Sequence, residues 1–303
     1  MDLTQLKNYA ETTRDIPKEI NAQQMMAELA SAVNIPEKHS RKYRIEHEII
    51  KQGTPVTLIS MRNAILMGYK SLNIIFDTDL KIHKLKSKDG GLLMSDHPQE
   101  IFLAHEGLKA AHGVVLMGGL GLGYAATKLA QRKDISRIYV IEIDKEIIKL
   151  VKPHLGPKIT VINESIYTFL RCYNYKVDYV FLDTWYQTSE STYWDTVFPL
   201  RILARKRFVK SEKDIFCWGE EEMLGQVKTS MCHVLSGDLK PWNKALYAVH
   251  VAIIRKLTKS DGLRDIPTVV NKFFTDIGSK EWEKEWHFSK CLKIADKNYK
   301  EQK

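Results

Sequence analysis

The chain has few of the features that mark secreted, membrane-spanning or metal-binding proteins. Its 303 residues include only four cysteines, which are widely scattered, with no CxxC pair and no histidine at metal-ligand spacing. No apolar run approaches the roughly 18 residues of a membrane-spanning helix. We therefore expect reduced thiols, no bound metal, no membrane contact and a cytoplasmic location.

A secretory signal is also missing from the first twenty residues, which carry charges throughout and contain no apolar core segment. The apolar share of 44% and the charged share of 27% are ordinary for a globular protein. A chain of 303 residues can form one large or two modest hydrophobic cores. We find no internal repeat and no low-complexity tract.

The net charge of +9 is concentrated near the C-terminus. Residues 1–200 contain 25 Lys and Arg against 23 Asp and Glu, whereas residues 201–303 contain 21 against 14. A basic C-terminal third suits an anionic partner such as nucleic acid. A solvated helical surface explains the same lysines, so both interpretations stay open, and a homodimer is also compatible with the sequence.

The strongest local pattern lies in residues 113–144. A short apolar run, Val114–Met117, predicts a strand buried on both faces, and GGLGLG follows at once. A helix fits residues 124–133, and a second apolar run at residues 138–141 ends on Glu142. Strand, glycine turn, helix, strand and acid form the βαβ unit of nucleotide-binding domains.

The pattern also suggests how a nucleotide would bind. Glycines let a ligand approach backbone N–H groups, and the helix N-terminus adds partial positive charge. Glu142 is placed to accept hydrogen bonds from the two ribose hydroxyls. The segment Gly121–Ala126 also satisfies the dinucleotide pattern G-x-G-x-x-G/A, so the pattern alone leaves the nucleotide open.

Two further predicted strands end in polar residues. Residues 158–162 are followed by Asn163 and Glu164, and residues 177–182 are followed by Asp183. The motifs GGLGLG, EID, NES and LDTW thus occur in order after four successive strands. Over residues 91–219 the chain resembles the spermidine-synthase-like branch of the S-adenosylmethionine-dependent methyltransferases.

That resemblance implies a Rossmann-like α/β domain that binds S-adenosyl-L-methionine. It implies a catalytic role for Asp183, which would meet the methionine ammonium or the acceptor's proton. The residues that it implies for cofactor binding are Gly119, Gly121, Gly123, Glu142, Ile143, Glu164, Ser165 and Asp183. The residues that it implies for substrate binding are Asp96, Glu100, Trp185 and Tyr186.

The resemblance leaves two transfer reactions open. Polyamine synthases have an acid pair of the form D-S-S-D after the fourth strand, and the corresponding residues here are Asp183-Thr-Trp-Tyr186. Because the second acid is missing, we favour methyl transfer over aminopropyl transfer to a polyamine. A non-catalytic, nucleic-acid-binding scaffold is a further alternative, motivated by the basic C-terminal third.

Composition and pattern also predict the organisation of the chain. We expect an N-terminal helical segment at 1–50, a small antiparallel β region at 51–98, the Rossmann-like domain at 99–236 and a C-terminal helical extension at 237–303. Short β-rich runs separated by Gly and Asp support the second region. Asp96 and Asp144 each precede a predicted helix, so capping is the alternative to ligand binding for both.

Overall fold

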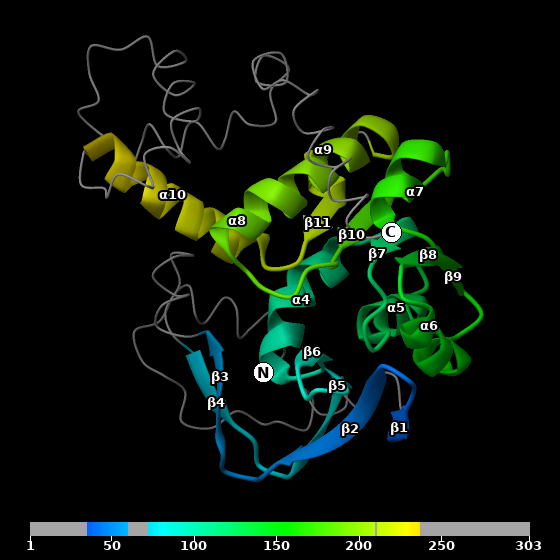
Figure 1. Cartoon of the computed structure of the whole chain (residues 1–303), viewed down its shortest axis with the longest axis vertical. Coiled ribbons are helices and arrows are strands. Elements are labelled where there is room, and N and C mark those ends of the chain that lie inside the picture. The colour runs from blue at the N-terminus through cyan, green and yellow to red at the C-terminus, as the bar shows by residue number, and fades with distance from the viewer. Residues whose placement is uncertain (1–34, 60–71, 210, 237–303) are drawn as a thin grey trace.

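The computed structural model describes residues 35–59, 72–209 and 211–236 (Figure 1). The helices predicted within 1–34 and 237–303, and most of the basic C-terminal third, lie outside these ranges. The division into four regions therefore stays a prediction. No helix in the described part of the chain is long and apolar enough to cross a bilayer.

A five-stranded parallel sheet forms the centre of the structure, as in a Rossmann-like α/β domain. Its order is β11-β10-β7-β8-β9, and every neighbouring pair is parallel. The strands are β7 (Gly113–Gly118), β8 (Ile135–Glu142), β9 (Ile159–Asn163), β10 (Tyr179–Leu182) and β11 (Ile215–Cys217). Four of these strands, β7 to β10, were predicted from their apolar runs, and the parallel sheet confirms that part of the predicted fold.

Helices cover both faces of this sheet. On one face lie α5 (Tyr124–Ala130) and α6 (Lys145–Val151), and on the other lie α7 (Ile166–Cys172), α9 (Phe198–Arg207) and α10 (Glu220–Ser236) (Figure 1). Alternate side chains of each strand enter the two cores, because successive strand residues point to opposite faces. The strands therefore read as continuous apolar runs rather than alternating ones.

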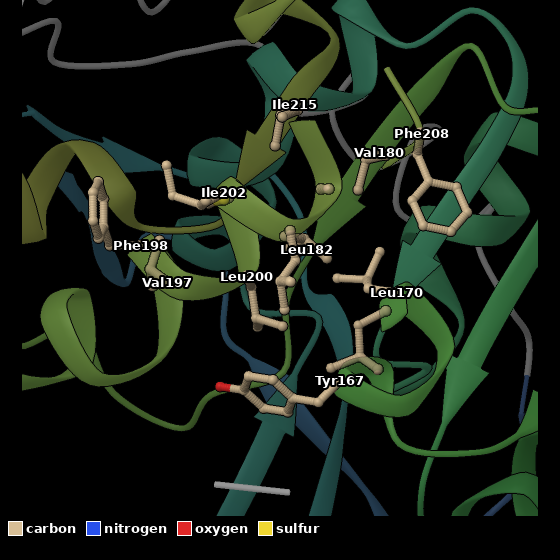
Figure 2. Packing of buried hydrophobic residues seen from close by; sticks show 14 of the residues in the cluster. Tyr167, Leu170, Val180, Leu182, Val197, Phe198, Leu200, Ile202, Phe208 and Ile215 are labelled. Atoms are coloured by element: carbon tan, nitrogen blue, oxygen red, sulfur yellow. The ribbon is translucent and has the colours of Figure 1, made fainter. Parts of the chain in front are cut away.

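Figure 2 shows the core on the α7 and α9 face. Aliphatic side chains of β10 lie between those two helices and are fully buried. The labelled members are Tyr167, Leu170, Val180, Leu182, Val197, Phe198, Leu200, Ile202, Phe208 and Ile215.

The helical stretch at residues 190–207 is interrupted. It starts as α8 (Glu190–Thr192), passes through a π-helical turn at Tyr193–Val197 and continues as α9. Pro199 lies in the first turn of α9 and has no N–H to donate to a preceding carbonyl, so regular α-helical pairing is lost there.

A second, antiparallel sheet precedes the parallel one, with the order β1-β2-β5-β6. Its strands are β1 (Lys38–His39), β2 (Tyr43–Ile50), β5 (Leu80–Ser87) and β6 (Leu92–Ser95), while β3 (Pro55–Ile59) pairs with β4 (Leu72–Ile75). Strands β3 to β6 lie within 51–98, the range predicted for the β region, whereas β1 and β2 lie before it.

The helical prediction for the N-terminal segment is wrong at β2. This strand pairs with β5 over its whole length, from Tyr43 opposite Ser87 to Ile50 opposite Leu80. Three isoleucines among its eight residues suit a pleated surface, and the long-range pairing with β5 outweighs any local helical preference.

Helix α4 (Pro98–Ala110) links the two sheets. His97 caps it, because its Nδ1 accepts a hydrogen bond from the N–H of Gln99 at 3.3 Å. Gly107 lets α4 approach the parallel sheet closely, since a Cβ there would overlap the ring of Phe216 in β11.

The C-terminal end of α4 is held by Arg132, which follows α5. Its guanidinium donates to the carbonyl oxygens of Leu108, Lys109 and Ala111 and also pairs with Asp134. A cation at this end satisfies carbonyls that have no partner within the helix and interacts favourably with the helix dipole.

We therefore expect Arg132→Met to lower the free energy of unfolding by about 1–3 kcal/mol, because several charge-assisted hydrogen bonds are lost. Urea unfolding measures the change. Lys109→Met is the control, since Lys109 is an exposed cation in the last turn of the same helix and should change stability by less than about 0.5 kcal/mol. Equal losses in the two variants would contradict this account.

Candidate active site

The order of the parallel sheet predicts where a ligand binds. From β7 the chain proceeds to β8 and β9 on one side and then returns to β10 on the other side. In such sheets the cleft lies beyond the carboxyl ends of the strands where the order reverses. A cavity of about 370 Å³ lies at this place, between the parallel sheet and the antiparallel sheet.

The glycine loop forms one wall of the cavity through Gly119 and Gly121. Both have positive φ angles, +92° and +49°. A Cβ on Gly119 would overlap the carbonyl oxygen of Asp183, and one on Gly121 would overlap the Sδ atom of Met94. Glycine is therefore required at both positions, because the loop packs closely against Asp183 and Met94.

Glu142 ends β8 beside this loop and is only 7% exposed. Its Oε2 accepts from the N–H of Leu120 at 3.0 Å, and its Oε1 accepts from the N–H of Asp144 at 2.8 Å. Burial raises the pKa of Glu142, while the two N–H donors partly oppose that rise. The carboxylate thus has a fixed orientation at the cavity wall.

Asp183 follows β10 and lies near Glu100 of α4, and both line the cavity. Burial raises the pKa of Asp183 to about 7, and the negative charge of Glu100 adds to this rise. Burial also raises the pKa of Glu100 to about 7. The chain after Asp183 lacks the second acid of the D-S-S-D pattern, but α4 supplies a second carboxyl group from a distant part of the sequence.

Glu164 lines the cavity at the end of β9, whereas its neighbour Ser165 does not. The Oε1 of Glu164 accepts from the N–H of Ser165 at 2.8 Å, and Ser165 is buried at the start of α7. Asn163 donates from Nδ2 to the carbonyls of Glu142 and Ile143, at 2.9 Å each. These bonds fasten the loop after β8 to the end of β9.

Aromatic residues and an isoleucine complete the walls. Trp185 is buried and donates from Nε1 to the carbonyl of Trp218 at 3.1 Å, while Tyr186 is 80% exposed at the rim. Ile143, which is half exposed, also lines the cavity.

Three of the predicted site residues do not line the cavity: Ser165, described above, Gly123 and Asp96. Gly123 caps α5 and donates its N–H to the carbonyl of Leu120 at 2.8 Å. Asp96 is buried, with its Oδ2 2.6 Å from Nδ1 of His83 and its Oδ1 bonded to the N–H of the same residue. Asp96 therefore does not line the cavity, because its carboxylate bonds to His83 of β5, and it does not cap α4, whose N-cap is His97.

Other lining residues were missed by the sequence analysis. Met94 lies against Gly121, and its Sδ accepts the N–H of Leu122 at 3.3 Å. Trp218 follows the carboxyl end of β11. Considering the residues that follow this strand, as for the other strands, would have found it. The missed residues are Leu85, Leu92, Leu93, Met94, Ser95, Ile141, Ile147, Ile166, Thr184 and Trp218.

The charged residues that line the cavity are all acidic. Four carboxyl groups, of Glu100, Glu142, Glu164 and Asp183, line it, and none of its described lining residues is a lysine, arginine or histidine. Such a site attracts cations and repels phosphates. Within the described residues, no cluster of three or more His, Cys, Asp or Glu is placed to hold a metal ion.

No protein family matches the chain, and no curated protein matches it. Among solved structures it is similar to spermidine synthase from Thermotoga maritima, at 12% identity and a TM-score of 0.31 over 43% of this chain and 50% of that one. It is also similar to spermidine synthase in complex with the transition state analogue AdoDATO, at 13% and 0.30 over 43% and 49%. A structure described as a type II methyltransferase from Anaeromyxobacter dehalogenans matches at 17% and 0.25 over 33% and 37%. The matches to the synthases span about half of their length, and overlaps of this size assign no function.

The two raised carboxyl pKa values predict a pH-dependent stability. Asp183 rises from 3.8 to about 7 and Glu100 from 4.5 to about 7, so the folded state binds protons more tightly than the unfolded state. The stability that these protons contribute is present in acid and is lost as the pH rises through about 7.

The double variant Glu100→Gln and Asp183→Asn removes this loss. Between about pH 5 and about pH 8 its free energy of unfolding should rise relative to that of the wild type by at least about 1 kcal/mol, as measured by urea unfolding. Glu48→Gln, which changes an exposed carboxylate paired with Lys84, is the control. A stability difference that does not change with pH would refute the assignment.

Proposed function

We propose that this chain is a transferase that uses S-adenosyl-L-methionine and that its reaction is methyl transfer. The observation that carries the proposal is the cavity itself, which is lined by the glycine loop and by four carboxyl groups, Glu142 among them, with no basic lining residue. A sulfonium and an ammonium group suit this charge, whereas the pyrophosphate of NAD does not.

The described residues have distinct roles in this proposal. The backbone at Gly119 and Gly121 holds the methionine end, and Glu142 accepts hydrogen bonds from the ribose. Ile143 and Glu164 lie beside the adenine, with Ser165 fixing Glu164. Because S-adenosyl-L-methionine supplies an already activated methyl group, the protein has mainly to align the acceptor with that carbon.

Asp183 is the residue to which we assign removal of a proton from the methyl acceptor. A carboxyl with a pKa of about 7 exchanges a proton readily at neutral pH, which suits a general base. A carboxylate oxygen of Asp183 takes the proton that the acceptor gives up, and the adjacent Glu100 raises its basicity. Trp185 and Tyr186 bound the space in which the acceptor lies.

Aminopropyl transfer to an amine is the second candidate, and the structure strengthens it. The objection from sequence was that a single acid cannot hold a dication, but Glu100 and Asp183 together provide two carboxyl groups. A nucleic-acid acceptor, suggested by the basic C-terminal third, would have to keep its phosphates outside this acidic cavity.

Cofactor choice is tested by calorimetry with S-adenosylhomocysteine and with NAD. We expect binding of the former and none of the latter. Glu142→Ala should weaken binding by about 1–3 kcal/mol, because charge-assisted hydrogen bonds to the ribose are lost. Glu48→Gln should bind as the wild type does, and unchanged affinity in a folded Glu142→Ala protein would sink the ribose assignment.

The reaction is tested with two cofactors. Methyl-labelled S-adenosylmethionine is offered with DNA, RNA, protein and small amines, and decarboxylated S-adenosylmethionine is offered with putrescine. We expect labelled product in the first assay, its loss in Asp183→Asn, and no spermidine in the second assay. Spermidine formed at enzymatic turnover would instead establish the aminopropyl alternative.

A further inference from the structure

The loop that carries Glu142 is joined to the antiparallel sheet by Tyr43, the first residue of β2. The hydroxyl of Tyr43 donates to Oδ2 of Asp144 at 2.8 Å, and Nζ of Lys42 lies 3.3 Å from the same oxygen. The other carboxylate oxygen of Asp144 caps α6 by accepting the N–H of Glu146 at 2.8 Å. Asp144 is thus fixed from two directions.

The hydrogen bonds continue from Asp144 to the cavity. The N–H of Asp144 donates to Oε1 of Glu142 at 2.8 Å, and Oε2 of Glu142 accepts the N–H of Leu120 in the glycine loop at 3.0 Å. An uninterrupted series of bonds therefore runs from the Tyr43 hydroxyl through Asp144 and Glu142 to the glycine loop.

Tyr43 is better placed than Lys42 to fix this loop. The tyrosine ring is partly buried and packs against the core on the α5 face of the parallel sheet. The Lys42 side chain is 60% exposed, and an exposed ion pair contributes little because water screens it and the long side chain must be ordered. Burial and the adjacent Asp144 carboxylate raise the pKa of Tyr43, so its hydroxyl keeps its proton and donates at neutral pH.

We propose that Tyr43, acting through Asp144, is a positioning residue for Glu142, so that the antiparallel sheet sets the affinity of the site for the adenosine part of its ligand. This inference rests on the proposed cofactor site. Tyr43 does not line the cavity, and it therefore acts on the ligand only by holding the turn Glu142–Asp144 in place. Without that bond the turn loses its tie to the antiparallel sheet, and fewer bonds hold Glu142 in the orientation that two ribose hydroxyls require.

The test uses Tyr43→Phe, which removes the hydroxyl and keeps the ring. Calorimetry with 5′-methylthioadenosine, which contains the ribose and adenine, should show affinity weaker by roughly 3- to 10-fold, the effect of one lost hydrogen bond. In a Glu142→Ala background the same substitution should change affinity by less than about twofold, since the group it positions is gone. Glu142→Leu, which also removes both carboxylate oxygens, serves if Glu142→Ala does not fold.

Tyr139→Phe is the matched control, because Tyr139 is a partly buried tyrosine of β8 outside the cavity lining. It should bind the probe as the wild type does. Unchanged affinity in Tyr43→Phe, or an equal loss with and without Glu142, would overturn the inference.

A second measurement separates this inference from the proposed function. Amide hydrogen exchange should accelerate at Asp144 and Leu120 in Tyr43→Phe, whatever the ligand is, because both N–H groups bond to Glu142. Unchanged exchange at Leu120 overturns the positioning role. If the wild-type protein binds neither 5′-methylthioadenosine nor S-adenosylhomocysteine, the proposed function fails, and the exchange rates alone decide on Tyr43.

Discussion

The arrangement of the site depends on the parallel direction of five strands. Because parallel strands end at one edge of their sheet, each polar residue that follows a strand is brought to the same cleft. Glu142, Glu164 and Asp183 come from three different strands and meet there for this reason alone. Gly119, which follows β7, contributes no side chain to the cleft, since any side chain there would collide with the backbone that follows β10.

Burial then gives Glu142 and Asp183 their properties. Both lie among apolar and aromatic side chains, so the charged form is disfavoured and the pKa of each rises. Glu142 recovers part of that cost through two backbone N–H donors, whereas Asp183 has a second acid nearby. The two positions thus differ in chemistry although the same rule of topology places them, with Glu142 suited to hold a ligand and Asp183 suited to exchange a proton.

The sequence predicted what depends on local pattern. Four of the five parallel strands, the glycine loop and the acids at the strand ends could be found because buried strands leave continuous apolar runs. Contacts between segments far apart in the chain could not be found in this way. The pairing of β2 with β5, the capture of Asp96 by His83 and the approach of Glu100 to Asp183 all depend on how the antiparallel sheet and α4 pack against the parallel sheet. No spacing rule within a single segment encodes these contacts.

The contact between Met94 and Gly121 has a consequence for folding. This cavity wall comes from two sheets, whose residues lie far apart in the chain, and neither sheet encloses the space by itself. A molecule bound there contacts both sheets at once and binds only the state in which they are packed together. Its binding free energy is therefore added to the cohesion between the two sheets, and the two layers unfold more cooperatively when the site is filled.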